Sequence, residues 1–320
     1  MAEKFYPVKK NGKYAFIDKL GSLITKFDFD FANMFGGIKV NEEFGYMDGK
    51  GTIHISPNYR YEYGFGGFND GLAIVEVDGE FGFINSENDI VIEPKYYRVN
   101  EFHNGIALVQ DNMFTSAYFI NTSGKTILNN REFGVSEYNE GLINCKSLIE
   151  KKWGFVDMDN NFIIPPIYDY TSSFHEGMAA VIPTLIGKKV NKKQLFGFVN
   201  RNNEVLIPPD FNIANGHFSE GLCCIWDNGN GYMDTKGEVV IPCEYLVGEN
   251  FSDGLASVQL KKNNKHGFIN RDGNMVIKPK FEHVERFENG IAKVTIGKDH
   301  AVYKEGYINK DGDYIWKPTR

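Results

Sequence analysis

Phe268-Ile269-Asn270-Arg271-Asp272-Gly273 is the stretch that decides the fold, because the chain repeats the same hairpin nine times. Each copy has an aromatic residue, an aliphatic residue, Asp or Asn, two variable residues, and then Gly or Asn. The copies begin at Phe16, Tyr46, Phe83, Phe119, Phe155, Phe198, Tyr232, Phe268 and Tyr307. Self-similarity at a fixed period is typical of a tandem-repeat protein.

The chemistry of the turn explains this order of residues. Asp or Asn favours the first position of a type I turn, because its side chain accepts a hydrogen bond from the backbone N–H two residues on. The last residue must then be left-handed to rejoin the strands of a three-residue loop. Gly adopts that conformation without steric cost, and Asn tolerates it. We therefore expect a positive φ at Gly273 and a strand on either side of the turn.

Two further patterns flank the hairpin. After the turn, an apolar run such as Met275 to Pro279 ends near a proline, which marks the strand end because it donates no ladder hydrogen bond. Before the next hairpin come an aromatic residue, two residues, Gly and an apolar run, as in Phe287 to Val294. We interpret this as a small turn followed by a third strand, in units of about 36 residues.

The fold class is therefore predicted to be all-β, with about nine antiparallel three-stranded units in an open superhelical or solenoid stack. The alternative is a closed propeller-like ring. Three strands per unit instead of four, and spacings of 30 to 43 residues between successive Asx positions, favour the open stack. We expect one continuous domain, 1–320, with units of roughly 4–36, 37–70, 71–104, 105–140, 141–176, 177–220, 221–253, 254–289 and 290–320.

Composition narrows the class of partner and compartment. The net charge of −7 disfavours a general nucleic-acid binder. The sequence contains no run of about 20 apolar residues, so we expect no transmembrane helix. The start, Met1 to Lys10, lacks the apolar core of a cleavable signal, so we expect a cytoplasmic protein, with export by an uncleaved signal as the alternative.

Little in the sequence indicates catalysis, a cofactor or a metal. The four cysteines lie within repeats and are expected to be small buried hydrophobes. The seven histidines show no zinc-ligand spacing, and no nucleophile lies in a recognisable elbow, so we expect no enzyme activity. Acids recur before the third-strand Gly, at Asp70, Glu140, Glu176, Glu220 and Asp253. They could bind calcium, but hydrogen bonding within turns and loops is the simpler interpretation.

Departures from the repeat are the best candidates for function, because the repeat geometry does not require them. The stretch from Tyr59 to Phe65 is a loop three residues longer than its counterparts, and Tyr59, Arg60, Tyr61 and Tyr63 are residue types common in interface hot spots. Trp226 occupies a slot that is mostly outward-facing in other units. Packing of the loop and local cover of Trp226 are the structural alternatives.

A lysine-rich insertion is the third departure. Lys188, Lys189, Lys192 and Lys193 lie in it, and other tips between third and first strands are also basic. Stacked units would bring these tips to one edge, with the recurrent acids elsewhere, so this edge could bind an anionic partner. The alternative is that the lysines keep exposed hairpins soluble and unpaired.

The repeat resembles the bacterial WG, or KWG, repeat family. The resemblance rests on Lys152-Trp153-Gly154-Phe155-Val156-Asp157, on Ile163 to Asp169 and on Phe174 to Val181. Only Trp153 is a tryptophan in the namesake slot, and the following Gly is replaced by Ala15 and Tyr118 in two copies. The resemblance implies a β scaffold used for binding, and by analogy a bacterial effector or toxin-immunity protein.

Two functions follow as hypotheses. The first is a non-catalytic protein-binding scaffold, with another protein of unknown identity as the partner. The second is a small-ligand or carbohydrate binder that uses aromatic shelves. Aromatic residues confined to core slots would favour the first hypothesis, and a row of outward aromatic residues would favour the second.

Overall fold

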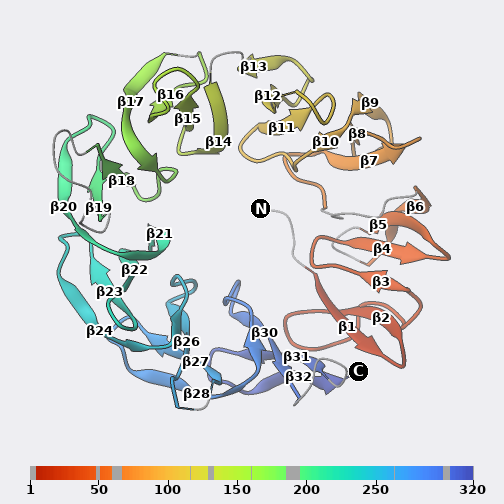
Figure 1. Ribbon diagram of the computed structural model, residues 1–320. Helices are drawn as coiled ribbons and strands as arrows, with labels where there is room; N and C mark the ends of the chain where they lie inside the picture. Colours follow the sequence, from red (N-terminus) through yellow and green to blue (C-terminus); the bar gives the residue numbers. More distant parts are fainter. Residues whose placement is uncertain are drawn as a thin grey trace. The chain divides into compact units, whose positions relative to one another are not determined.

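A computed structural model describes residues 5–47, 51–59, 67–115, 117–128, 133–159, 161–184, 195–262, 264–297 and 303–319 (Figure 1). These residues form an all-β structure of antiparallel sheets. They contain no helix, and so none with the length and apolarity needed to cross a membrane. The chain divides into two compact units, Met1–Arg131 with Thr319–Arg320, and Glu132–Pro318.

The first unit holds four sheets, each with its strands in chain order. The strands are β1 (Tyr6–Lys10) and β2 (Lys13–Ile17); β3 (Phe31–Ala32), β4 (Gly37–Val40), β5 (Glu43–Met47) and β6 (Ile53–Tyr59); β7 (Ala73–Val77), β8 (Glu80–Ile84) and β9 (Ile90–Tyr96); and β10 (Arg98–Val99), β11 (Ile106–Gln110), β12 (Tyr118–Asn121) and β13 (Thr126–Leu128).

The second unit holds a seven-stranded sheet and three four-stranded sheets. The strands are β14 (Phe133–Asn139), β15 (Leu142–Ser147), β16 (Trp153–Val156), β17 (Phe162–Thr171), β18 (Ala179–Pro183), β19 (Phe196–Val199) and β20 (Val205–Phe211); β21 (Ile213–Ser219), β22 (Leu222–Trp226), β23 (Asn230–Asp234) and β24 (Val239–Tyr245); β25 (Val247–Gly248), β26 (Leu255–Gln259), β27 (His266–Asn270) and β28 (Met275–Phe281); and β29 (His283–Val284), β30 (Ile291–Ile296), β31 (Lys304–Asn309) and β32 (Tyr314–Thr319).

The prediction of three strands per unit is wrong, because five of the sheets have four strands. We name the strands of such a sheet a, b, c and d in chain order. The missed a strand is short, often two residues such as Val247–Gly248, and two residues give too little alternation to be recognised in sequence. The number of repeats is confirmed, since nine b–c pairs occur, from β1–β2 to β30–β31. The strand-count argument for an open stack therefore no longer holds.

The Asx hairpin between the c and d strands forms as predicted. Eight of its nine last residues have positive φ, including 80° at Gly273 and 62° at Asn203, and the ninth, Asn160, lies outside the described residues. The Asn270 side-chain oxygen accepts hydrogen bonds from the backbone N–H groups of Asp272, at 3.1 Å, and Asn274, at 2.8 Å. One short polar side chain thus organises the whole loop.

The Gly of the namesake motif is required because the d strand crosses it closely. A Cβ atom at Gly267 would lie 2.4 Å from the carbonyl oxygen of Ile277, and one at Gly154 would lie 2.5 Å from that of Ile164. The pairing register shifts at this point in both sheets. The two exceptions, Ala15 and Tyr118, lie in sheets that have no d strand of six residues or more among the described residues. Gly at this position of the motif therefore indicates a long d strand in the same sheet.

The predicted turn before the b strand is a two-residue hairpin turn. Glu220 and Gly221 have φ values of 53° and 76°, and the same pair of positive φ values recurs at Asp253 and Gly254. Positive φ at both central residues matches a type I′ turn, whose twist suits antiparallel strands. We call this the tight turn.

Hydrophobic clusters form between successive sheets. Leu255, Phe268 and Ile277 of one sheet pack with Phe287, Ala292, Val294 and Ile308 of the next. Alternate residues of a b strand point to opposite faces, so Leu255 belongs to this cluster while Ala256 and Val258 pack against the preceding sheet. The sheet of β25–β28 is therefore covered on both faces by its neighbours, which is why one repeat could not bury its core alone.

The two repeated aromatic residues meet across six of these junctions within the two units. The ring of Phe268 on its c strand contacts the ring of Phe287, which precedes the next tight turn, with centroids 4.7 Å apart and an edge-to-face angle of 65°. The same geometry joins Phe83 to Phe102 and Phe155 to Phe174. Edge-to-face pairs contribute roughly 0.5–1.5 kcal/mol beyond the area they bury.

A second link joins successive tight turns through the recurrent acids. The carboxylate of Glu220 accepts a hydrogen bond from the backbone N–H of Gly254 at 2.9 Å, and that of Asp253 accepts one from Gly290 at 2.7 Å. Asp70, Glu140 and Glu176 bond in the same way to Gly105, Gly177 and Gly221. The predicted use of these acids in loop hydrogen bonding is confirmed, and the bonds run between repeats.

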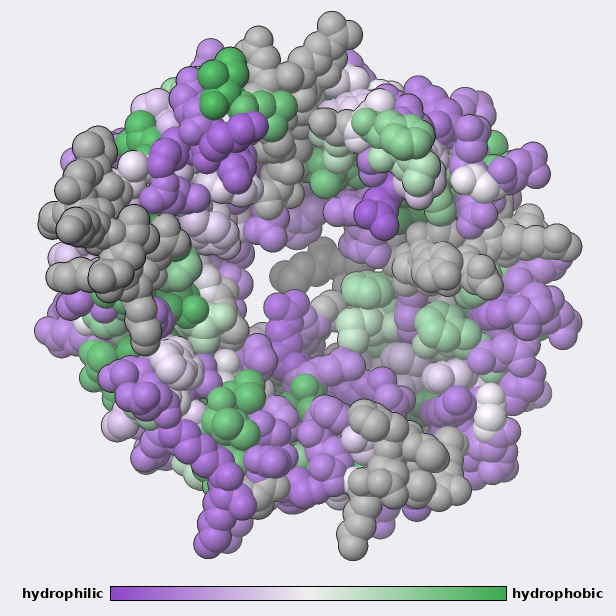
Figure 2. Space-filling view, viewed as in Figure 1, coloured by the Kyte–Doolittle hydropathy of each residue, from purple (hydrophilic) through white to green (hydrophobic). Residues whose placement is uncertain are grey.

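The surface is largely hydrophilic in the view of Figure 2, with apolar residues in separate patches. Paired apolar residues at the start of the d strands contribute to the exposed apolar surface, among them Val239 with Val240 and Met275 with Val276. These residues lie on edge strands, and the prolines that follow in each case, Pro242 and Pro279, limit further strand pairing.

We expect Gly273→Val to lower the free energy of unfolding by roughly 1–3 kcal/mol more than Asn274→Val. A β-branched residue is strained at the φ of 80° found at Gly273, whereas Asn274 is exposed and bonds to Asn270 through its backbone N–H and carbonyl, which the substitution keeps. Urea unfolding of the two variants measures the difference. Equal losses would show that the turn conformation does not limit stability.

We also expect Glu220→Ala to cost about 1–2 kcal/mol, because it removes a charge-assisted acceptor for the N–H of Gly254 at a half-buried site. Glu238→Ala, an exposed acid in the neighbouring hairpin, is the control and should change stability little. Glu220→Gln should fall between the two. The link between repeats would be energetically unimportant if Glu220→Ala matched the control.

Candidate functional site: the loop edge

In each sheet, the connections at the two ends of the strands differ chemically. The tight turns and the Asx hairpins lie at one end, which we call the turn edge. The b–c connections and the links from a d strand to the next a strand lie at the other end, which we call the loop edge. Strand β26 shows the contrast, because Asp253 precedes its start while Lys261 and Lys262 follow its end. The topology therefore separates the recurrent acids from the lysine-rich tips within each sheet.

Aromatic rings form rows along the loop edge. Trp153, at the start of β16, contacts Tyr170 in β17 with centroids 6.2 Å apart, and Tyr170 contacts Phe196 of β19 at 5.7 Å. In the first unit, Tyr14, Phe31 and Phe44 repeat the arrangement at 6.1 and 6.4 Å. The middle rings are the most open, with Tyr170 42% and Phe31 36% exposed. We call these trios ring rows.

In a third ring row, two of the three rings are imidazoles. His266, His283 and Tyr303 follow one another with centroids 6.4 and 5.4 Å apart. Burial lowers the pKa of His266, and His283 lowers it further, while Glu282 opposes them. His266 is therefore neutral at pH 7.

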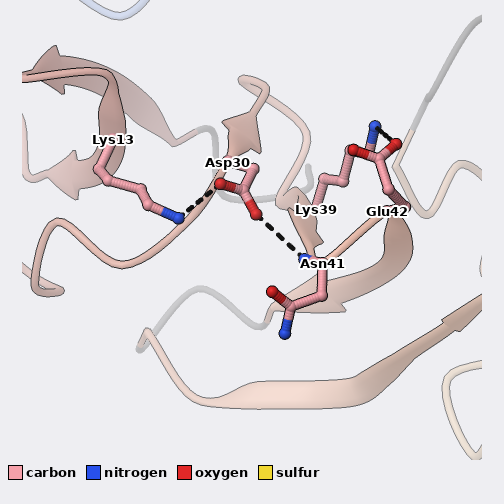
Figure 3. Close-up of polar contacts among 5 residues, drawn as sticks. All are labelled: Lys13, Asp30, Lys39, Asn41 and Glu42. Carbon is pink, nitrogen blue, oxygen red and sulfur yellow. Dashed lines mark hydrogen bonds and ion pairs between the residues drawn. The ribbon is translucent and has the colours of Figure 1, made fainter.

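A lysine–acid pair flanks each ring row. Lys13 bonds to Asp30 at 2.5 Å, and Asp30 also accepts the backbone N–H of Asn41 at 3.0 Å, beside a second pair of Lys39 with Glu42 (Figure 3). The bond from Lys13 holds the pKa of Asp30 below its usual range. The matching pairs at the other rows are Lys152 with Asp169 and Lys265 with Glu282.

Lysine ammonium groups also lie over the rings. The Nζ atom of Lys146 is 5.7 Å from the ring centre of Trp153, that of Lys9 is 5.0 Å from Tyr14, and that of Lys39 is 5.2 Å from Phe44. Cation–π contacts restrict these long side chains before any partner arrives, which reduces the entropy lost on binding. The loop edge thus carries lysines held over aromatic rings beside lysine–acid pairs.

Trp226 lies at this edge, at the end of β22. Its indole is 43% exposed, as the outward slot predicts, and its backbone N–H donates to the carbonyl of Asn212 at 2.9 Å. Its backbone pairs in register with Asn230 across the b–c turn. Neighbouring residues therefore do not cover the indole completely. A role of Trp226 in binding stays a prediction.

The other predicted contact residues are not described by the structure. Arg60, Tyr61 and Tyr63 lie outside the described residues, as do Lys188, Lys189, Lys192 and Lys193. Tyr59 ends β6, but only its backbone is described. Their assignment to binding therefore stays a prediction.

The sequence carried a signal for the ring rows that the motif analysis missed. Lys13-Tyr14, Lys152-Trp153 and Lys265-His266 are each followed 17 residues later by an acid and a ring, as Asp30-Phe31, Asp169-Tyr170 and Glu282-His283. At the same spacing, Glu43-Phe44 is followed by Arg60-Tyr61, with the charges reversed. Tyr61 thus occupies the sequence position of the exposed middle ring.

Among the described residues, no group of three or more His, Cys, Asp or Glu side chains could hold a metal ion. Three of the four cysteines are buried as predicted, and Cys243 is half-buried. Burial raises the pKa of Cys145 and of Cys224 to about 12, so both are uncharged thiols at pH 7. The acids of the turn edge are occupied by backbone N–H groups.

Comparison with known proteins gives one family match. The model of the "WG containing repeat" family matches residues 44–80, 81–112, 153–182, 196–229, 231–265 and 267–298, which together make up more than half of the chain. No curated protein matches the chain.

Solved structures match at low similarity. Citrobacter koseri AztD is 11% identical over 99% of this chain and 93% of that one, with a TM-score of 0.42. The CRINKLY WD40 ectodomain of the Arabidopsis thaliana receptor kinase ACR4 is 11% identical over 87% and 98%, with a TM-score of 0.38. We draw no functional argument from likenesses at this level.

Proposed function

Because this chain belongs to the WG-containing repeat family, we propose that it is a non-catalytic scaffold that binds another protein through its loop edge. The observation that carries the proposal is the exposure of Trp226 and Tyr170 on that edge, at positions where neither turn geometry nor core packing requires an exposed ring. Trp and Tyr offer large contact areas at low entropic cost and are enriched among interface hot spots.

The charge of the loop edge defines the partner further. Lys9, Lys39 and Lys146 are held over rings, and the predicted basic insertion falls between β18 and β19, which it connects in sequence. A partner with an acidic surface fits this edge, although the protein as a whole is acidic. A bacterial effector or toxin-immunity role in the cytoplasm is the setting we propose.

The ring rows favour a second candidate, a small-ligand or carbohydrate binder. Tyr170 presents an exposed ring face next to Asp169, which accepts a hydrogen bond from the hydroxyl of Thr184 at 3.3 Å. An open ring beside fixed polar groups suits a sugar, whose apolar face stacks while its hydroxyls hydrogen-bond. Neighbouring rings in the rows that begin at Tyr14 and Trp153 meet at 55–88°, so each of these two rows forms a ridge and not a flat platform, which favours a protein surface.

Alanine variants test both candidates. Trp226→Ala, Tyr170→Ala and Tyr61→Ala should each weaken partner binding by about 2 kcal/mol, roughly 30-fold, with little change in melting temperature. Phe162→Ala is the matched control, because Phe162 lies on the same strand as Tyr170, is also 42% exposed, and sits at the opposite edge.

Site-specific photo-crosslinking in the source cell identifies the partner. A crosslinking residue at position 170 or 226 should give a protein adduct that the same residue at position 162 does not. Retardation of the protein in gels containing a soluble polysaccharide, lost in Tyr170→Ala, would instead support the carbohydrate candidate. Equal adducts at positions 162, 170 and 226 would contradict the assignment of the loop edge.

We propose the open superhelical stack in preference to the closed ring, because the spacings of 30 to 43 residues between hairpins are uneven for a symmetric ring. Deleting residues 297–320 should then lower the melting temperature modestly and leave one cooperative transition. A closed ring would lose its seam, and the truncated chain would unfold or aggregate.

A further inference from the structure

Two histidines from successive repeats stack at the turn edge of the second unit. The imidazole of His175, in the tight turn between β17 and β18, lies against that of His217 in β21, with ring centres 4.0 Å apart and planes 20° from parallel. The contact lies close to the aromatic pair of Phe198 and Phe218, which joins the same two sheets. It is thus part of a junction between repeats.

Amide groups hold both ends of this stack. The Nδ2 atom of Asn139 is 3.1 Å from Nδ1 and 3.3 Å from Nε2 of His175, and the Nδ2 atom of Asn250 is 2.7 Å from Nε2 of His217. The hydroxyl of Ser173 is 3.2 Å from Nε2 of His175. The Oδ1 atom of Asn139 accepts the backbone N–H of Glu140 at 3.0 Å, which leaves its Nδ2 as the donor toward His175. An amide N–H donates to the lone pair of an unprotonated ring nitrogen, so this contact fits a neutral His175.

The charged groups around His175 are three carboxylates, and all three act on its pKa in the same direction. Glu137 and Glu140 face it from β14 and its tight turn, and Glu176 follows it in its own turn. Burial lowers the pKa of His175, and these carboxylates counteract the effect without reversing it. The ring is neutral at pH 7.

The next two repeats have a serine in place of His175, and at the first of their two junctions a histidine takes part only through the contact of His217 with Asn250. Ser219 and Ser252 occupy the sequence position of His175, and their hydroxyls donate to the backbone carbonyls of Phe251 and Phe287 at 2.7 and 2.6 Å. Those bonds are unchanged by protons near neutral pH. The junction between the tight turn of His175 and β21 therefore differs chemically from its neighbours.

We propose that the stacked pair of His175 and His217 is a proton-sensitive junction that holds the two repeats together at neutral pH and loosens on acidification. A second ring proton on His175 meets the amide donor of Asn139 where the neutral ring offers a lone pair, and protons on both rings place two positive charges about 4 Å apart. The physical consequence is weaker attachment of β21 and β22 to the preceding repeat.

The sign of the pH effect follows from linkage. The folded protein binds the proton on His175 less well than the unfolded chain does, so its contribution to stability is complete above the ordinary histidine pKa of about 6.5 and is lost as the pH falls below it. Carboxylate protonation affects the whole chain at lower pH, so the diagnostic range is about pH 5.5–8.

Hydrogen exchange of the intact chain tests the proposal directly. Amide protection in residues 172–182 and 213–225, corrected for the intrinsic effect of pH, should fall at least about tenfold between pH 7.5 and 5.5. Residues 287–296, whose junction uses Ser252, should keep their protection. Unchanged protection in the first two segments would overturn the proposal without any variant.

Phenylalanine variants supply the second test. His217→Phe keeps a ring to stack on His175 but removes the second proton site, so its melting midpoint should fall by about 3 °C less than that of the wild type over this pH range. His103→Phe is the control, because His103 holds the same slot in the first unit and should leave the pH dependence unchanged. A wild-type pH dependence in His217→Phe would overturn the proposal.

Discussion

The edge-to-face contact between two phenyl rings of successive repeats is the interaction on which the structure depends. One ring belongs to the c strand beside the Asx hairpin and the other precedes the next tight turn, as with Phe268 and Phe287. A sheet of short strands buries too little surface to be stable alone, so its core must come from its neighbours. The Gly beside the c-strand ring lets the d strand cross closely and complete that surface.

This core requires only one part of each repeat and leaves both sheet edges open to variation. At the turn edge, backbone N–H groups and carboxylates tie the repeats together, so the acids there have a structural task. At the loop edge, one position of the repeat holds Tyr14, Trp153 or His266, and the hairpin forms in each case. Because the fold does not require particular side chains at the loop edge, this edge is the better candidate surface for recognition.

The junctions themselves are not equivalent, although the repeat makes them look so. Serine hydroxyls bond to backbone carbonyls at two junctions, whereas stacked imidazoles occupy the corresponding place at His175 and His217. In a repeat array, stability is approximately a sum of units and neighbouring interfaces, so one altered interface can open without the others. Local chemistry at a single junction can therefore give the array a defined weak point.

The sequence by itself determined the all-β class, the nine hairpins and the left-handed turn residues. These follow from turn chemistry within six residues and from period-two alternation, which are local constraints. Only the tertiary structure decided the fourth strand, the exchange of acids and Gly N–H groups between repeats, the ring rows and the histidine stack. The acid–glycine bonds, the ring rows and the histidine stack join residues 13 to 45 positions apart. They depend on the register and packing of neighbouring sheets, which no single repeat encodes.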